Sequence, residues 1–210
     1  MDALLKTVYD EVINGDQKAV EAGVQAAMQA GLPVASILNE ALIAAMDEVG
    51  DLFERQEFYV PEMLVAARAM QSGLTLLKPH LAQAGVAAAG KVVLGTVKGD
   101  LHDIGKSLVG MMLEGAGFEV IDLGTDVAPQ AFGEAVRAHQ PQLVGLSALL
   151  TTTMQNMKST LEALEDMGVR ADVRVMIGGA PVTDAFATEI GADGYAPDAS
   201  RAVALAKKLL

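Results

Sequence analysis

The first part of the chain carries apolar residues at the spacing of amphipathic helices. One apolar stripe consists of Leu4, Leu5, Val8 and Val12, and it ends at Asn14-Gly15. Similar patterns follow three more times before residue 78, separated by short connections that contain glycine, proline or polar residues. Four helices with short connections predict a small helical bundle. The expected helices cover residues 2–14, 16–30, 33–49 and 61–77.

Two segments of this region depart from the helical pattern. Residues 50–60 connect the third and fourth helices and hold Phe53, Phe58 and Tyr59. We interpret this aromatic connection either as a hydrophobic plug or as part of a surface that faces a second domain. Residues 78–90, KPHLAQAGVAAAG, are small and bounded by glycine, which is typical of a linker. The alternative for this segment is a frayed extension of the fourth helix.

After the linker, strand-like runs and helical patterns alternate. Residues 91–97 form a compact, β-branched apolar run, which is typical of a buried parallel strand. Five such strand–helix units predict a parallel sheet with helices on both faces, and the flavodoxin-like strand order 2-1-3-4-5 suits this length. The expected strands cover residues 91–97, 118–122, 142–147, 172–177 and 193–195, and the helices cover 104–116, 128–139, 153–167, 181–190 and 198–209.

The pattern therefore predicts an α domain followed by an α/β domain. Residues 1–77 would form an N-terminal four-helix bundle, residues 78–90 the linker, and residues 91–210 a flavodoxin-like (Rossmann-type) domain with a five-stranded parallel sheet.

The composition excludes several classes of function. The chain has 51% hydrophobic residues, no cysteine and a net charge of −12. This charge disfavours nucleic acid as a partner, because phosphate backbones require a cationic surface. No apolar stretch is long enough to span a bilayer, and the acidic start MDALLKTVYDEV is unlike a signal peptide. We therefore expect a cytoplasmic protein that binds no membrane and contains no disulfide or catalytic thiol.

The loop after the first predicted strand holds the strongest chemical candidate. Within it, His102 lies between two carboxylates, Asp100 and Asp103, just before a helix that begins near Ile104. Ligands of open α/β sheets bind at the carboxyl ends of the strands. A histidine at this place can bind a metal through one ring nitrogen while a carboxylate holds the other N–H group. Asp100 and Asp103 are both candidates for that carboxylate.

Two other interpretations of this loop are disfavoured. The tripeptide Gly105-Lys106-Ser107 resembles the end of a phosphate-binding P-loop, but that motif requires a glycine where Asp100 stands. A carboxylate at that position would repel a triphosphate. A zinc site is also disfavoured, because the chain has no cysteine and only three histidines.

Two later loops reach the same edge of the predicted sheet. In the order 2-1-3-4-5, the ligand crevice lies between the carboxyl ends of the first and third strands. The third strand leads into residues 147–153, a run of hydroxyl-bearing and small side chains, and the fourth leads into Gly178-Gly179. A glycine pair allows the backbone to approach a ligand closely. The convergence of the three loops, more than any one of them, indicates a ligand site.

The three loops together resemble the signature of base-off/His-on corrinoid-binding proteins. The resemblance covers the whole chain, because a four-helix cap before the corrinoid domain is the arrangement of methyltransferase corrinoid proteins. The chain is similar to the cobalamin-binding portion of methionine synthase, and closer to the small methyl carriers that serve methanol, methylamine or methoxyarene methyltransferases. The matching residues are Asp100-x-His102-x-x-Gly105, then Ser147-x-Leu149 after 41 residues (106–146), then Gly178-Gly179 after 28 residues (150–177).

The resemblance implies a role for each of these residues. His102 would be the lower axial ligand of the cobalt, in place of the corrinoid's own nucleotide base, and Asp100 would hydrogen-bond its other nitrogen. Protonation of this pair would tune whether the histidine stays bound. Asp103, Ile104 and Gly105 would complete the loop against the cofactor. The displaced nucleotide tail would enter a slot lined by Ser147, Leu149, Thr151, Gly178 and Gly179.

The implied function is that of a methyl carrier. Cobalt(I) would take a methyl group from a substrate-specific methyltransferase, and methylcobalt(III) would pass it to an acceptor methyltransferase that acts on tetrahydrofolate or a thiol. A reductive activator would be a further partner. The carrier would be the corrinoid subunit of an enzyme system, with little turnover alone. The bundle would shield the upper face of the corrinoid, with Phe58, Met63 and Met46 as candidates for its lid.

Other functions on the same scaffold fit the sequence less well. A corrinoid-dependent sensor or regulator is the main alternative, but such proteins join these domains to a DNA-binding helix-turn-helix, which we do not expect in this acidic chain. A phosphoacceptor receiver domain would need an aspartate where Ser147 stands. A coenzyme-B12 mutase subunit is disfavoured by the helical cap, because mutases place a barrel over the cobalt.

Overall fold

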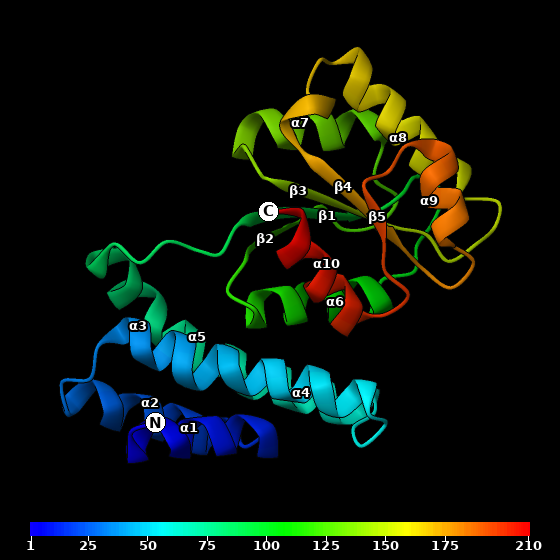
Figure 1. Cartoon of the computed structure of the whole chain (residues 1–210). Helices are drawn as coiled ribbons and strands as arrows, with labels where there is room; N and C mark the ends of the chain where they lie inside the picture. Colours follow the sequence, from blue (N-terminus) through cyan, green and yellow to red (C-terminus); the bar gives the residue numbers. More distant parts are fainter. The chain divides into compact units, whose positions relative to one another are not determined.

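The computed structural model describes residues 1–210, apart from the side chain of Ala82, and the chain forms two compact units (Figure 1). One unit comprises Met1–Ala89 and Glu114–Gly117, and the other comprises Gly90–Leu113 and Phe118–Leu210. Across the described residues, no helix has the length and apolar character that a membrane crossing requires.

The first unit contains the predicted helical bundle. Helices α1 (Ala3–Asn14) and α2 (Gln17–Gln29) are followed by a continuous helical rod and by α5 (Val60–Ala84). The rod consists of α3 (Val34–Ser36), the π-helix η1 (Ile37–Ile43) and α4 (Ala44–Glu54). The turn between α1 and α2 follows the local chemistry of the sequence: Gly15 is left-handed with φ 75°, and the Asp16 carboxylate caps α2 by accepting from the Ala19 N–H.

The third helix is longer than the sequence pattern predicted. Gly50 was expected to begin a connection, but it is a buried interior residue of α4, which continues to Glu54. A buried glycine in a packed helix keeps its helical conformation because tertiary packing outweighs its low propensity. The chain leaves the helix where Gln56 adopts a left-handed conformation with φ 62°, so Phe53 is helical and Phe58 lies in the connection.

Helix α5 extends into the segment that was predicted to be a linker. It runs through Pro79 to Ala84, so residues 78–84 are helical and the alternative of a helix extension applies to them. Pro79 removes one backbone donor from the helix, but good helix formers follow it. The helix ends at Gly85, which is left-handed with φ 67°, and the Val86 N–H donates to the Leu81 carbonyl across this turn.

The second unit contains the predicted five-stranded parallel sheet in the order β2-β1-β3-β4-β5, which confirms the flavodoxin-like topology. At its carboxyl edge, Ser147 lies between Thr96 of the first strand and Gly178 of the fourth. The three predicted loops therefore leave adjacent strands. The strands are β1 (Lys91–Thr96), β2 (Glu119–Asp122), β3 (Leu143–Ser147), β4 (Arg174–Gly178) and β5 (Gly194–Tyr195).

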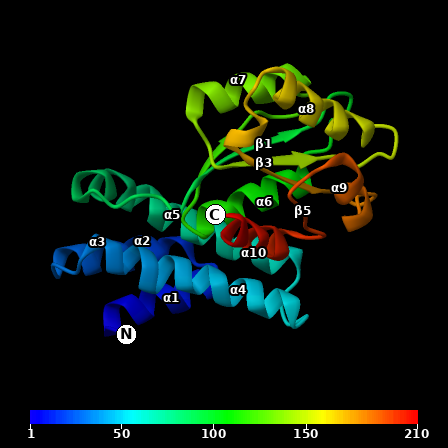
Figure 2. The ribbon, with the colours of Figure 1, turned by 45° about the horizontal axis from the view of Figure 1, so that its top comes forward.

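Helices cover both faces of this sheet (Figures 1 and 2). The helices α7 (Pro129–His139), α8 (Gln155–Asp166) and α9 (Asp184–Ile190) lie on one face, and α6 (Ile104–Gly115) and α10 (Ala199–Leu209) lie on the other. A short 3-10 helix, Arg170–Asp172, precedes β4.

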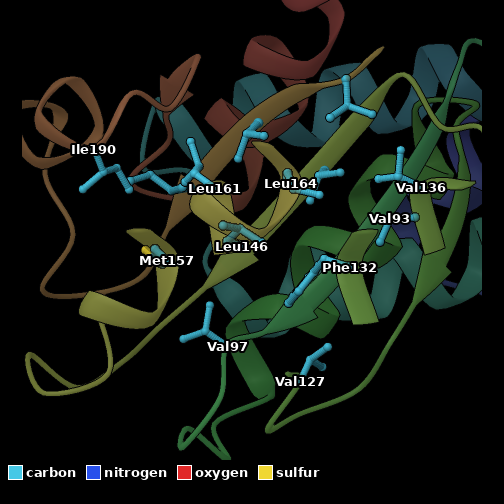
Figure 3. Close-up of a cluster of buried hydrophobic side chains, with 14 of the residues drawn as sticks. Val93, Val97, Val127, Phe132, Val136, Leu146, Met157, Leu161, Leu164 and Ile190 are labelled. Atoms are coloured by element: carbon cyan, nitrogen blue, oxygen red, sulfur yellow. The ribbon is translucent and has the colours of Figure 1, made fainter. Parts of the chain in front are cut away.

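The core on the α7–α8 face supports the strand that carries the histidine loop (Figure 3). Phe132 of α7 is fully buried, and Val93, Val97 and Val127 belong to the same cluster. A Cβ atom on Gly95 would lie 2.6 Å from the Phe132 ring, so the glycine makes room for this side chain on β1. Close packing of this kind fixes the end of β1 from which the loop departs.

Candidate functional site

The histidine loop begins directly after β1 and folds back over the end of that strand. The Asp100 N–H donates to the Val97 carbonyl at 3.1 Å, which closes a tight turn. The hydroxyl of Thr96 donates to the His102 carbonyl at 2.9 Å, which holds the next part of the loop to the strand. These two bonds place Asp100 inward and His102 at the surface.

The carboxylate of Asp100 lies at the centre of the site and is completely buried. Its Oδ1 accepts from the His102 N–H at 3.0 Å and lies 2.7 Å from Nδ1 of the His102 ring. Its Oδ2 accepts from the Thr153 hydroxyl at 2.7 Å and from the backbone N–H groups of Leu149 at 2.8 Å and Leu150 at 3.3 Å. One side chain thus joins the loops that follow β1 and β3.

These donors keep the buried carboxylate charged. Burial by itself raises the pKa of Asp100, but the hydrogen bonds from Thr153, Leu149 and His102 together outweigh burial and hold its pKa well below the ordinary range. An ionised Asp100 has no proton to donate, so towards the imidazole it can act only as a hydrogen-bond acceptor.

His102 is thereby prepared to act as a ligand. Its side chain is 51% exposed, while its Nδ1 faces the Asp100 carboxylate. A carboxylate acceptor at Nδ1 favours the tautomer with the proton on that nitrogen, which leaves the lone pair on Nε2 free. The geometry therefore offers one imidazole nitrogen, on a partly exposed ring of fixed orientation, to a metal or to an acid.

The second carboxylate of the loop has a different role from the first. Asp103 pairs with Lys106 at 2.8 Å and accepts from the Ser107 hydroxyl at 2.9 Å. Lys106 is 4% exposed and also pairs with Asp122 at the end of β2. Of the two carboxylates that the sequence offered to the imidazole, Asp100 therefore supports it, and Asp103 anchors the first turn of α6.

The loops after β3 and β4 approach each other closely. The Ala148 N–H donates to the Gly178 carbonyl at 3.2 Å, and a Cβ atom on Gly179 would overlap the carbonyl oxygen of Ala148. Gly179 also has a positive φ of 131°, so both its conformation and its surroundings require glycine. Ser147 is partly buried beside this crossing, whereas Thr151 is exposed on the loop.

An apolar rim accompanies the histidine. Leu101 and Ile104 are 74% and 83% exposed, and Leu149 and Leu150 are 41% and 43% exposed. Ile104 begins α6, and the other three lie in the two loops that Asp100 joins. A Cβ atom on Gly105 would meet no atom within 4 Å, so this position opens to free space. Exposed apolar side chains gathered at one site are typical of a binding surface.

Thr153 is part of this site but was not predicted from the sequence. It lies in a run of three threonines, 151–153, and no local signal separates it from the other two. Only the fold shows that its hydroxyl is buried against Asp100 while Thr151 and Thr152 are exposed.

The residues proposed for a lid are not all accessible. Met46 and Met63 are 2% and 0% exposed, which makes them core residues, a common use of methionine at helical spacing. Phe58 is partly buried and lines a pocket of the first unit with Ile13 and Pro61.

Comparison with known proteins gives two family matches. The model of a B12 binding domain matches residues 90–204, and a second model, also described as a B12 binding domain, matches residues 4–78. The chain is 45% identical to dimethylamine corrinoid protein 3 of Methanosarcina acetivorans, over 100% of this chain and 98% of the relative.

Two solved structures share the fold over nearly the whole chain. A cobalamin-binding protein from Desulfitobacterium hafniense has a TM-score of 0.82 and 32% identity, and covers 100% of this chain and 99% of that one. The methanol:cobalamin methyltransferase complex MtaBC from Methanosarcina barkeri has a TM-score of 0.87 and 29% identity, and covers 99% of this chain and 80% of the matched chain.

The hydrogen bond from Thr153 provides a test of the site that needs no ligand. Thr153→Val keeps the shape of the side chain but removes one donor from a buried carboxylate. We expect the free energy of unfolding to fall by about 1–3 kcal/mol, the usual cost of an unsatisfied buried group. Urea unfolding measures this change, with the exposed Thr152→Val as the matched control. Equal stabilities of the two variants would contradict the geometry described for Asp100.

Proposed function

The chain belongs to the family of B12 binding domain proteins, and on this premise we propose that it is the corrinoid-binding methyl carrier of a methylamine methyltransferase system. The name of the dimethylamine relative supports a methylated amine as the source of the methyl group. The structure of the MtaBC complex supports a methyltransferase as the direct partner. An acceptor methyltransferase, acting on tetrahydrofolate or a thiol, and a reductive activator complete the proposed system.

The candidate site fits a corrinoid. Its apolar rim suits a broad macrocycle, and Gly105 leaves open space beside the imidazole. The observation that carries the proposal is the pairing of a buried, ionised Asp100 with a half-exposed His102. A histidine whose second nitrogen is held by a carboxylate is the usual arrangement of a protein metal ligand.

We propose that His102 holds the cobalt through Nε2, in the base-off/His-on mode. When bound, the corrinoid supplies a cobalt centre that accepts and releases a methyl group. His102 would supply a nitrogen ligand to the cobalt, and Asp100 would keep the imidazole proton on Nδ1. The donors from Thr153 and Leu149 fix the carboxylate, so the imidazole orientation stays constant whether or not Nε2 is bound. The apolar rim excludes water from the covered face.

We also propose where the displaced nucleotide tail lies. The close approach of the loops after β3 and β4, and the small side chains there, support a narrow slot at the carboxyl edge of the sheet. Its position next to the β1 loop would let one ligand reach both places. The residues proposed to line it are Ser147, Leu149, Thr151, Gly178 and Gly179, with Asp103, Ile104 and Gly105 bordering the macrocycle.

Substitutions at the proposed ligand test the proposed mechanism. His102→Ala removes the nitrogen, so the axial histidine and methyl transfer with the cognate methyltransferase should both be lost. Asp100→Asn leaves the nitrogen but weakens control of the tautomer, which costs about 10–100-fold in affinity or activity at comparable metal sites. Electron paramagnetic resonance of the cobalt(II) form, on isotope-labelled protein, detects coupling to a histidine nitrogen.

The other two histidines are the controls for this series. His80 lies in α5. His139 ends α7, near the amino end of β3, whereas the candidate site lies at the carboxyl ends of the strands. Both alanine variants should keep the axial histidine and the parent rate. If His102→Ala retains nitrogen coupling while His80→Ala or His139→Ala loses it, the proposed ligation is wrong.

A larger side chain at an open position tests the proposed binding surface. Gly105→Leu should leave the apoprotein folded, because nothing lies within 4 Å of its Cβ atom, yet it would intrude on the macrocycle. Ser147→Leu should obstruct the tail slot in the same way. A steric penalty of about 1–3 kcal/mol corresponds to about a 5- to 150-fold loss of corrinoid affinity, measured by titration of absorbance.

The control for these two variants is Glu134→Leu, on the exposed surface of α7. Gly179→Leu is unsuitable, because the overlap with Ala148 would disturb the fold itself. Parent-like affinity in both Gly105→Leu and Ser147→Leu would place the corrinoid elsewhere.

A further inference from the structure

One peptide group in the turn before Asp100 is held at both ends by side chains of other elements. The turn comprises Val97-Lys98-Gly99-Asp100, and it is closed by the bond from the Asp100 N–H to the Val97 carbonyl. Gly99, its third residue, has φ 81°. Lys98, its second residue, has no positive φ, and this combination with a φ near 80° at the third residue is that of a type II turn.

The peptide between Lys98 and Gly99 is the central peptide of this turn. Its carbonyl accepts from Nδ2 of Asn156, on α8, at 2.7 Å. Its N–H donates to Oδ1 of Asp126, in the loop between β2 and α7, at 2.7 Å. The two side chains therefore hold opposite poles of one peptide dipole.

The backbone conformation of Asp126 is consistent with this contact. Its backbone is left-handed, with φ 54°, a conformation that aspartate and asparagine tolerate better than most residues. Its own N–H donates to the Asp100 carbonyl at 2.9 Å. Asp126 thus binds the Gly99 N–H group through its side chain and the Asp100 carbonyl through its backbone. Among the described residues, it has no hydrogen bond to the His102 side chain.

The alternative state of this turn is a flip of the same peptide. Type I and type II turns differ mainly in the orientation of the central peptide, since ψ of the second residue and φ of the third both change by more than 140°. A flipped peptide would point its N–H away from Asp126 and its carbonyl away from Asn156. The turn leads directly into Asp100, so its state sets the start of the loop that carries His102.

We propose that Asp126 and Asn156 are positioning residues for His102. By holding the Lys98–Gly99 peptide in the type II state, they form the loop before the corrinoid arrives. Pre-forming a site removes the cost of ordering it from the binding free energy. This inference rests on the function proposed above, in that the group to be positioned is the axial ligand.

The first test separates the carboxylate of Asp126 from its backbone conformation. Asp126→Gly removes the acceptor but adopts the left-handed conformation without strain. Asp126→Asn retains an acceptor oxygen and should restore the parent behaviour. In the apoprotein, NMR hydrogen exchange should show a protected Gly99 amide in the parent and in Asp126→Asn, and an unprotected one in Asp126→Gly.

The same variants are then titrated with cobalamin. Asp126→Gly and Asn156→Ala should each weaken binding about tenfold, the lower end of the effect seen for groups outside the first ligand shell. Both should also reduce the fraction of cobalt(II) that shows coupling to a histidine nitrogen, whereas Asp126→Asn should match the parent.

Gly99→Ala provides a test with a matched control. Alanine is disfavoured at φ 81°, but its Cβ would lie no closer than 3.7 Å to its nearest neighbour, a Thr153 methyl group, so the change acts through the backbone. Gly168→Ala carries the same backbone penalty at φ 71°, with nothing within 4 Å, and lies after α8. Gly99→Ala should weaken cobalamin binding and histidine coordination, and Gly168→Ala should not.

Four outcomes would overturn the proposal. The first two are a Gly99 amide that stays protected from exchange in Asp126→Gly, and an Asp126→Asn variant that binds cobalamin as weakly as Asp126→Gly. The third is a Gly99 amide that loses its protection while cobalamin binding is unchanged. The fourth is an equal effect of Gly99→Ala and Gly168→Ala on cobalamin binding. If the parent binds cobalamin without a histidine nitrogen, the proposed function fails instead, and hydrogen exchange in the apoprotein still decides the state of the turn.

Discussion

The candidate site depends on one buried carboxylate. A charged carboxylate without partners is costly to remove from water, so Asp100 can be ionised in the interior only because donors surround it. Those donors come from its own loop, through His102, and from the loop after β3, through Thr153 and the backbone of Leu149 and Leu150. The need to satisfy this charge therefore fixes the two loops to each other as well as fixing the imidazole.

The sheet topology makes this arrangement possible. In the order β2-β1-β3-β4-β5, the first and third strands are neighbours, so residues about 50 positions apart meet at one edge. Phe132 packs on Gly95 and supports β1 from below the loop. The buried core around β1 thus ends where the histidine loop begins, and the half-exposed ring of His102 lies beyond it.

The sequence predicted most of the fold and the identity of the histidine loop, because strand and helix periodicity and short motifs are local signals. Local signals also explain the errors: Gly50 was placed in a connection and residues 78–84 in a linker, but both lie within helices that tertiary packing or good neighbouring helix formers maintain. Thr153 could not be distinguished from the threonines before it. Asp126 and Asn156 contact the loop from distant segments, which no local pattern reveals.

The central claim is that Asp100 fixes the imidazole of His102 with its proton on Nδ1 and its lone pair on Nε2. Nitrogen-15 NMR of the apoprotein, labelled at histidine, measures the tautomer directly. The account predicts that His102 carries its proton on Nδ1 in the parent protein, and that Asp100→Ala shifts the tautomer toward the Nε2–H form that free imidazole side chains favour. A His102 ring protonated at Nε2 in the parent, or a tautomer unaffected by the loss of Asp100, would contradict it.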